Sequence, residues 1–497
     1  MFSLRIYFGF LCGCWTLLAS AQQPFDLDTT FRCQFNDWYV NSIMPLEDGT
    51  LLLSGKMRYP EVMSFSFRST IIVDPNGGRI DSFPWFNSAG GGKLTRWGDK
   101  IYAGTSQTVR RLLGNGLIDT GFIQMNSDPL FGSLQGGDYH VYPDGSILMT
   151  GAHNLFDTAR GFVGLYNLIW FTNTGRLDTT KIHRKGSGVV YEIEPLANGQ
   201  FLCYTTGDFY EGQGVGHVFR VFADGSLDTT MHTNINWGET YSFLPLPDGR
   251  FYAAGIFSFT NGPQDIRRLM RFLPNGDIDT TFNNNIDFDR GEIPGSIYGA
   301  TVSPIQPWVH GSLLVMGTYQ FVSEQPRRGI CVIDSTGQVL DVFDGCGVGT
   351  YIYQGTTYGS VRGMLADQDG MAYIWGTYHG YNDGTTNDTL QRFVTRLYGP
   401  NFPTLVTEPV VEKERPFKVY PNPASGLVTF TYDLKEQPKE DAFVVVKDAV
   451  GRQIVALPMK NSQGQLVMDT RELAKGMYTV SFTQAGKNLQ VENLVVE

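Results

Sequence analysis

The chain lacks the short motifs by which most catalytic and metal-binding sites are recognised. Its 497 residues contain no HExxH, GxSxG or phosphate-binding loop, and its 7 histidines and 6 cysteines do not cluster at metal-ligand spacing. Basic residues are also few: 38 Lys and Arg face 49 Asp and Glu, for a net charge of −11. This charge argues against the basic surface that nucleic acids and anionic lipids require. We therefore expect no catalytic, cofactor-binding or metal-binding residue, no cofactor and no nucleic-acid partner.

Long apolar runs are absent after the first 20 residues. The beginning of the chain has the pattern of an export signal, with a positive charge at Arg5, an apolar stretch over residues 6–18 and small residues before a cleavage site. The apolar stretch is too short for a stable membrane span. We expect residues 1–21 to be a signal peptide that is cleaved between Ala21 and Gln22.

Cysteine is scarce in the exported chain, which keeps Cys33, Cys203, Cys331 and Cys346. There is no CxxC pair, and a fold of this size does not need disulfides even outside the cell. Cys203 lies in an apolar stretch and is expected to be a buried thiol. Cys331 and Cys346 lie closest in the sequence, so they are the one pair considered for a disulfide.

Glycine is abundant, with 58 residues, and many of them belong to a repeated segment. The segment has a turn, an apolar residue and then Asp-Thr-Thr or a shorter form of it. Its copies are residues 275–282, 224–230, 174–180 and 115–120, and a copy without the turn at residues 27–31. Such regular recurrence is the sequence signature of a repeat architecture.

A second landmark divides the chain into seven units. It is a pair of glycines that enclose an apolar run, usually six residues apart. The pairs are Gly49/Gly55, Gly98/Gly104, Gly145/Gly151, Gly199/Gly207, Gly249/Gly255, Gly311/Gly317 and Gly370/Gly376. A short run that is apolar at every position predicts a strand covered on both faces. Asp or Asn before the first glycine is typical of a hairpin turn.

Each unit therefore predicts a meander of about four strands, the size of a propeller blade. A single meander cannot bury both of its faces, so the units must stack. We predict an all-β fold with a seven-bladed β-propeller over residues 22–401. The last unit lacks its own Asp-Thr-Thr, so the N-terminal segment 24–31 is expected to complete that blade and close the ring. The units resemble the delta-60 repeats of secreted bacterial β-propeller proteins, a resemblance that implies no activity.

The repeated Asp-Thr-Thr is interpreted as scaffold. Asp and Thr side chains hydrogen-bond backbone N–H groups two residues on, which stabilises a turn. A motif present in many units has a structural role that every unit needs, whereas a catalytic group is expected only once in the chain. A calcium loop at residues 287–291 or 367–370 is the alternative, although neither has the run of oxygen ligands ending in Glu.

The composition changes at residue 402. Residues 402–416 are charged and rich in proline, as a linker is, and residues 417–497 contain six or seven short alternating strands. This pattern predicts a small Ig-like β-sandwich. Its landmarks are Tyr420, Pro421, Asn422, Pro423, Gly451, Gly476 and Tyr478.

These landmarks resemble the type A sorting domain of the type IX secretion system (T9SS) of Bacteroidetes. The resemblance covers residues 417–497. It implies handling by the type IX secretion machinery, passage through the outer membrane, and release or anchoring at the cell surface. It implies no catalysis by this domain.

Two functions remain open for the predicted propeller. The first is a secreted or cell-surface binding or scaffold protein, expected to be a monomer, that presents its loops to a glycan or protein ligand. The second is an extracellular glycan hydrolase or lyase. It predicts two carboxylates facing each other at the propeller channel, whereas the first predicts only scattered polar residues there.

Overall fold

The chain forms two units, residues 1–404 and 405–497, in a computed structural model. The structure describes residues 24–59, 67–83, 90–259, 266–291, 299–343, 345–353, 355–366, 370–382 and 391–399 of the first unit. In the second unit it describes residues 417–420, 422–433, 442–448, 452–471, 473–484 and 487–496. The predicted cleavage site at Ala21 and Gln22 and the predicted linker 402–416 lie outside these residues.

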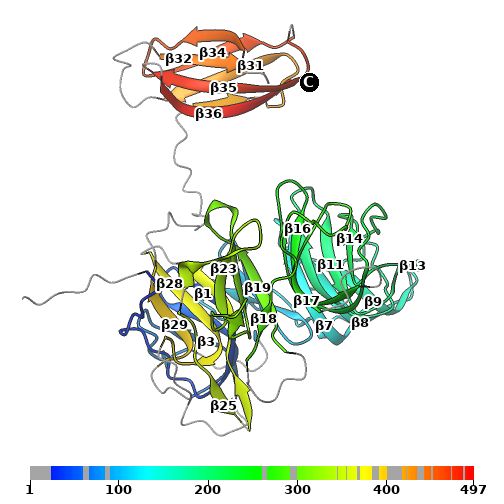
Figure 1. Ribbon diagram of the computed structural model, residues 1–497. Coiled ribbons are helices and arrows are strands. Elements are labelled where there is room, and N and C mark those ends of the chain that lie inside the picture. The colour runs from blue at the N-terminus through cyan, green and yellow to red at the C-terminus, as the bar shows by residue number, and fades with distance from the viewer. Residues whose placement is uncertain are drawn as a thin grey trace, which may run out of the picture. The chain divides into compact units, whose positions relative to one another are not determined.

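Seven antiparallel sheets follow one another along the described part of the first unit (Figure 1). The first three consist of β1 (Asp37–Pro45), β2 (Leu51–Arg58) and β3 (Arg68–Val73); β4 (Leu94–Trp97), β5 (Lys100–Gly104) and β6 (Val109–Leu113); and β7 (Phe131–Val141), β8 (Ile147–Asp157) and β9 (Phe162–Phe171). The next two consist of β10 (Val190–Pro195), β11 (Phe201–Thr205) and β14 (Val218–Val221); and β15 (Ile235–Pro245), β16 (Phe251–Phe259) and β17 (Arg267–Phe272). The last two consist of β19 (Val302–Pro307), β20 (Leu313–Gly317), β23 (Ile330–Ile333) and β24 (Val339–Leu340); and β27 (Ser360–Ala366), β28 (Met371–His379) and β29 (Arg392–Tyr398).

Short β-ribbons and single turns of 3-10 helix lie in the connections between these strands. The ribbons pair β12 (Phe209–Tyr210) with β13 (Gln213–Gly214), β21 (Phe321–Val322) with β18 (Phe288–Asp289) and β22 (Gln325–Pro326), and β25 (Tyr351–Tyr353) with β26 (Thr356–Tyr358). The 3-10 turns are η1 (Met125–Ser127), η2 (Val309–Gly311) and η3 (Asp341–Phe343).

The paired glycines have two physical roles. Gly49, in the turn between β1 and β2, has a φ of +82°, a conformation that favours glycine. Gly255 lies where the register of β15 against β16 shifts, and a Cβ there would lie 1.9 Å from the carbonyl oxygen of Glu239. A side chain cannot fit against this bulge, so the second glycine of the pair is required as well.

The predicted fourth strand of each unit is reduced to a single bridge in most sheets. The residue before the motif aspartate pairs with the outer strand, as Ile278 does with Phe272 and Leu227 with Val221. The structure therefore corrects the expectation of about four full strands per unit. A short segment is enough at this position because a side-chain network, described below, holds it.

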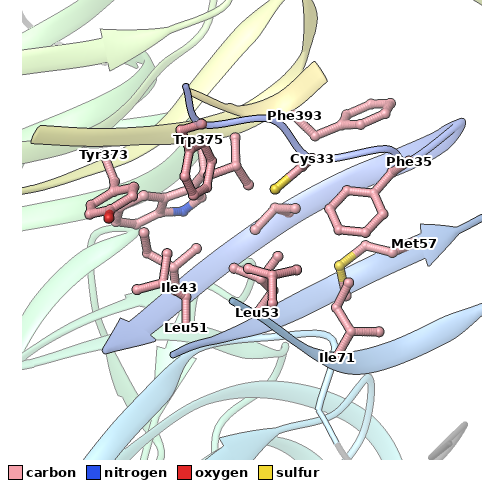
Figure 2. Close-up of a cluster of buried hydrophobic side chains, with 14 of the residues drawn as sticks. Cys33, Phe35, Ile43, Leu51, Leu53, Met57, Ile71, Tyr373, Trp375 and Phe393 are labelled. Atoms are coloured by element: carbon pink, nitrogen blue, oxygen red, sulfur yellow. The ribbon is translucent and has the colours of Figure 1, made fainter. Parts of the chain in front are cut away.

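The middle strands are buried on both faces, as their apolar runs predict. Leu52 and Leu53 are both fully buried, and successive residues of a strand point to opposite faces. Leu52 packs in one cluster with Ile101 of the second sheet, whereas Leu53 packs in another with Tyr373 and Trp375 of the last sheet (Figure 2). The core thus lies between neighbouring sheets.

Each sheet contacts the next, and the last contacts the first. The contacts join β1 to β4, β5 to β7, β7 to β10, β10 to β15, β15 to β19, β19 to β27, and β27 and β28 to β1. In Figure 1, β28 and β29 accordingly lie beside β1. The indole N–H of Trp375 donates to the carbonyl oxygen of Asn41 at 3.0 Å across the last of these contacts.

The N-terminal segment lies along the outer strand of the last sheet. Leu27 forms an antiparallel bridge with Leu397, the Asp28 N–H donates to the Arg396 carbonyl at 3.0 Å, and the Tyr398 N–H donates to the Asp26 carbonyl at 2.9 Å. Ile278 and Leu227 occupy the same position in their own sheets. Residues from the beginning of the chain therefore stand where the last unit has no motif of its own.

The second unit consists of two antiparallel sheets. One pairs β31 (Leu427–Asp433) with β30 (Phe417–Tyr420) and β34 (Gln463–Asp469). The other has the order β33 (Gln453–Pro458), β32 (Ala442–Lys447), β35 (Gly476–Gln484), β36 (Lys487–Val496). Phe430 of the first sheet and Val444 and Phe482 of the second belong to one buried cluster, so the two sheets enclose a common core.

The all-β prediction is confirmed, while the number of blades and the Ig-like class of the second unit stay predictions. Within the described ranges, no helix has the length and hydropathy of a membrane span.

Candidate functional site

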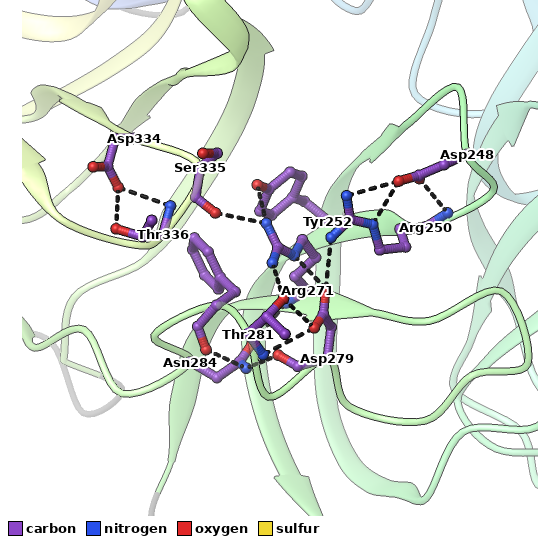
Figure 3. Close-up of polar contacts among 11 residues, drawn as sticks. Asp248, Arg250, Tyr252, Arg271, Asp279, Thr281, Asn284, Asp334, Ser335 and Thr336 are labelled. Carbon is purple, nitrogen blue, oxygen red and sulfur yellow. Dashed lines mark hydrogen bonds and ion pairs between the residues drawn. The ribbon is translucent and has the colours of Figure 1, made fainter.

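The Asp-Thr-Thr motif forms a side-chain network that joins neighbouring sheets (Figure 3). Asp279 Oδ1 accepts hydrogen bonds from the N–H of Thr281 at 2.9 Å and from its hydroxyl at 2.6 Å. Asp279 Oδ2 accepts from Nε of Arg271, on the outer strand β17, at 2.7 Å. The same guanidinium donates to Tyr252 Oη and to the carbonyl oxygen of Ser335 in the following sheet.

Three other copies repeat this arrangement. In each, the motif aspartate pairs with an outer-strand arginine at 2.6–2.8 Å, and that arginine also donates to a carbonyl oxygen of the following repeat. The aspartate–arginine pairs are Asp119–Arg111, Asp228–Arg220 and Asp28–Arg396. The recurrence supports the scaffold interpretation of the motif.

The motif carboxylates are ionised anchors. Burial would raise the pKa of Asp228, but hydrogen bonds from Thr230 and Arg220 outweigh it and lower the pKa to about 2. The pKa of Asp28 is lowered in the same way, by Thr30 and Arg396 against the effect of burial. None of these groups is poised to exchange a proton near neutral pH.

The cavity with the most unusual chemistry lies along the first strands of successive sheets. It has a volume of about 410 Å³, within the range of small-ligand sites. Its walls come from β1, β7, β10, β15 and β19, and from the residues just before β4. First strands of five sheets line it, together with residues just before β4, and the cavity is called the channel below.

Four charged side chains meet in this channel: Lys93, Asp138, Glu192 and Glu194. Lys93 Nζ lies 3.1 Å from both carboxylate oxygens of Asp138 and donates to the carbonyl oxygen of Tyr139 at 3.1 Å. Asp138 is largely buried, while half of the Lys93 side chain faces solvent. Both glutamates come from β10 and are partly buried.

The channel raises the pKa of both of its glutamates. Burial raises the pKa of Glu192 well above its usual value, the repulsion of Asp138 adds to this, and Lys93 opposes it. Burial raises the pKa of Glu194 to about 7. The pKa of Lys93 is raised by Asp138 although burial acts to lower it. At neutral pH the channel thus presents an ammonium group ion-paired with Asp138, a glutamate at position 192 that tends to stay protonated, and a glutamate at position 194 that is near its titration midpoint.

This set of groups can both donate and accept hydrogen bonds. A protonated carboxyl donates, an ionised one accepts, and the ring hydroxyl of Tyr191 can do both, whereas that of Tyr241 already donates to Glu239. Across the described part of the chain, no group of three or more His, Cys, Asp or Glu side chains is placed to hold a metal ion. Of the calcium alternatives, Asp289 Oδ1 accepts from the Gly291 N–H, and residues 367–369 lie outside the described residues.

We predict that Glu194 weakens the fold at neutral pH. Its pKa rises from an ordinary 4.5 to about 7 in the folded chain, so the folded state binds more protons and its stability falls as the pH rises between these values. Glu194→Gln should therefore raise the free energy of unfolding at pH 7, by on the order of 1 kcal/mol, with no gain at pH 4. Denaturant unfolding at both pH values tests this. The exposed turn variant Glu47→Gln is the control, and equal behaviour of the two variants would contradict the prediction.

The four cysteines are free thiols in the structure, which corrects the Cys331–Cys346 disulfide considered from the sequence. Cys331 is buried on β23, where its sulfur accepts a hydrogen bond from Tyr319 Oη at 3.3 Å. Cys346 packs in a different cluster and accepts from Asn382 Nδ2 at 3.2 Å. Closeness in sequence failed as a guide because the two residues belong to different packing layers.

We predict that one thiol reacts in the folded protein. Burial raises the pKa of Cys331 to about 12 and raises those of Cys33 and Cys203 as well, so these thiols are neither ionised nor accessible. In a chain that begins at residue 22, a thiol reagent should label Cys346 alone before unfolding. Peptide mass spectrometry identifies the label, and Cys346→Ser should abolish it. Recovery of a Cys331–Cys346 disulfide peptide would contradict the prediction.

The motif residues of the second unit hold its first loop against its last strand. The side-chain oxygen of Asn422 accepts from the Val495 N–H at 2.9 Å, and the Tyr478 hydroxyl donates to the Ala474 carbonyl at 2.8 Å. Tyr420 is half-exposed, Pro423 follows a cis peptide bond, and Gly476 has a φ of +150°. Pro421 and Gly451 lie outside the described residues.

The charged channel residues were not predicted from the sequence, although the repeat contains a signal for them. In every repeat except the second of the seven, the residue seven positions before the turn glycine lies on the first strand of its sheet. In order these residues are Ser42, Asp138, Glu192, Ser242, Pro304 and Gly363. All but Gly363 line the channel. Only Asp138 and Glu192 are charged. The third and fourth repeats therefore differ from the others at the position that faces the cavity.

Comparison with known families identifies the second unit. Residues 418–497 match the secretion system C-terminal sorting domain, over nearly the whole unit. The second unit is a type IX sorting domain. The sorting domain directs the protein through the type IX secretion system to the cell surface or the extracellular space. The predicted resemblance is thereby confirmed.

The first unit matches a family as well. Residues 204–230 and 246–282 match a β-propeller domain of unknown function (DUF5122), which confirms the propeller class. These residues span one copy of the motif in each segment. No curated protein matches the chain.

Several solved structures are similar at low identity. An extracellular domain from B. thetaiotaomicron is 11% identical with a TM-score of 0.37, and the match covers 96% of this chain and 58% of that one. A protein of unknown function from Bacteroides caccae is 14% identical, with a TM-score of 0.29 and 60% and 93% covered. Apo AztD from Citrobacter koseri is 13% identical, with a TM-score of 0.24 and 88% and 97% covered. The chain thus spans less than two thirds of the first structure, and TM-scores below 0.5 support no conclusion.

Proposed function

We propose that the exported propeller binds a glycan in its central channel. The observation that carries this proposal is the set of Lys93, Asp138, Glu192 and Glu194 in one cavity with tyrosines. A sugar presents hydroxyl groups that both donate and accept, and this lining offers partners of both kinds. Aromatic rings with a polar tip suit a ligand with one apolar and one polar face.

The proposal includes the architecture. The seven sheets are the blades of a closed seven-bladed ring, residues 24–31 complete the last blade, and the protein acts as a monomer. The cycle of contacts from the first sheet through the last supports closure. A closed ring fixes the first strands around one axis, which brings side chains from distant units into one cavity.

A glycan array with the full chain, followed by titration of the best oligosaccharide, tests the proposal. Glu192→Gln and Asp138→Asn should each lower the affinity about ten- to a hundred-fold, the effect expected for a lost hydrogen bond to a charged or buried group. Glu47→Gln, which changes an exposed glutamate in the β1–β2 turn, should leave the affinity unchanged. Failure to bind any glycan would contradict the proposal, as would binding that both channel variants retain.

Glycan hydrolysis is a second candidate, favoured by one observation. Glu194, with a pKa of about 7, lines the same cavity as Asp138, which pairs with Lys93, and a glycosidase uses two carboxyl groups as acid and base. Chromogenic glycosides test for turnover. If hydrolysis occurs, Glu194→Gln should remove it while binding persists. Turnover that survives substitution of Asp138, Glu192 and Glu194 together would exclude this candidate.

A further inference from the structure

A second pocket lies beside the first and last sheets and has a different chemistry from the channel. Its volume is about 290 Å³, and its walls include Trp38, Tyr39, Arg290, Tyr358 and Arg362. Trp38 and Tyr39 belong to β1, Tyr358 to β26 and Arg362 to β27, whereas Arg290 follows β18. The first and last sheets form most of the pocket, and Arg290 and Thr318 from the middle of the first unit complete it.

The pocket lining carries positive charge and no carboxylate. Its charged members are Arg290 and Arg362, and no Asp or Glu is among the lining residues. The nearest acids along the chain are already engaged: Asp37 pairs with Arg58, and Asp289 accepts from the Gly291 N–H. Two cations without a counter-charge in the cavity wall favour an anionic ligand.

Two buried donors in this pocket have no hydrogen-bond partner among the described residues. They are Nε of Arg290 and the indole N–H of Trp38. Nη2 of Arg290 is held by the Thr357 carbonyl at 3.3 Å, which leaves the Nε edge free. A buried donor without a partner is costly, and native structures usually satisfy it with protein, water or ligand.

Arg362 is held in place while still facing solvent. Its Nε donates to Thr377 Oγ1 at 3.1 Å, an Nη group donates to Asn41, and its guanidinium lies 4.7 Å from the centre of the Tyr39 ring. The side chain remains exposed in spite of these contacts. A fixed guanidinium loses little side-chain entropy when an anion binds.

We propose that this pocket binds a small carboxylate carried on a ring, of the uronic-acid class. The guanidinium groups bind the carboxylate, whose planar shape matches their donors. The Arg290 Nε and Trp38 N–H gain an acceptor, which neither has among the described residues. The tyrosine walls contact the ring, and the volume suits a single six-membered ring. The site does not depend on the proposed channel function, because it shares no lining residue with the channel.

Titration of the full chain with glucuronate, glucose and inorganic phosphate tests the proposal. Glucuronate should bind and glucose should not, since only the carboxylate meets the arginines. Arg290→Gln and Arg362→Gln should each lower the glucuronate affinity at least about tenfold. Arg176→Gln removes one exposed arginine from a turn elsewhere and should have no effect. Arg362→Lys keeps the charge but not the planar donors, so its affinity should lie between those of Arg362→Gln and the unaltered chain.

Four results would overturn the proposal. They are equal binding of glucose and glucuronate, unchanged affinity in both glutamine variants, phosphate binding as tight as that of glucuronate, and loss of glucuronate binding in Glu192→Gln. The last would place the ligand in the channel. Circular dichroism identifies a variant that fails to fold, in which case the other arginine variant decides the outcome.

Discussion

Arg396→Ala should destabilise the propeller by about 3 kcal/mol, the cost expected when one partner of a buried ion pair is removed. Nε of Arg396 lies 2.6 Å from Asp28 Oδ2, and Asp28 is almost completely buried. The guanidinium also donates to Thr30 Oγ1 at 3.0 Å and to the Pro75 carbonyl of the first sheet. The substitution therefore leaves a buried charge unpaired and releases the N-terminal segment from the last sheet. Guanidinium unfolding followed by tryptophan fluorescence measures the loss.

Arg471→Ala is the matched control, because Arg471 pairs with Asp469 on an exposed surface of the sorting domain. Such exposed pairs contribute about 0–1 kcal/mol. The pKa of Asp28 is lowered in the folded chain, so the contribution of the pair is present above about pH 4 and is lost as the pH falls below it. If Arg396→Ala were no less stable than Arg471→Ala at pH 7, the N-terminal segment would not be what closes the sheets.

Removal of residues 417–497 should abolish delivery beyond the outer membrane. These residues contain the sorting domain, which forms a unit with its own buried core. The first unit keeps all of its sheets in the truncated chain, so it should accumulate folded in the periplasm. Fractionation with protease accessibility on whole cells measures the location.

A transfer experiment provides the control for this prediction. Residues 402–497 fused to an unrelated periplasmic reporter should bring the reporter to the surface or the medium. Normal delivery of the truncated protein, or retention of the fused reporter, would contradict the assignment of sorting to this domain.

Much of the fold could be predicted because local physics specifies it repeatedly. The same strand arrangement is predicted by three features, each present in several copies. They are the turn glycines, the apolar runs between them and the Asp-Thr-Thr turns. The place of Leu27 beside Leu397 followed from the same logic, since a motif missing at one end of the chain was present at the other. The length of the outermost strand was overestimated. Side chains such as Arg271 hold this segment by hydrogen bonds, where backbone pairing was expected to hold it.

The sites were less accessible to sequence reasoning. Lys93, Asp138 and Glu192 lie in three consecutive repeats, and the packing of neighbouring sheets brings them into one cavity. Arg290 and Arg362 are likewise separated along the chain and look like ordinary surface charges in the sequence. A single position of the repeat, seven residues before the turn glycine, points to the channel carboxylates. It becomes informative only when the first strand is known to face a cavity.

The central claim is that the repeated motif is scaffold and that function lies where the repeat departs from itself. The most direct test is the affinity of the best oligosaccharide for Glu192→Gln and Asp178→Asn, side by side. Asp178 is a motif aspartate whose unit has Trp170 in place of the outer-strand arginine, so its substitution should be tolerated by the fold. The account predicts at least about a tenfold loss for Glu192→Gln and no change for Asp178→Asn. Loss of affinity in Asp178→Asn with unchanged affinity in Glu192→Gln would contradict it.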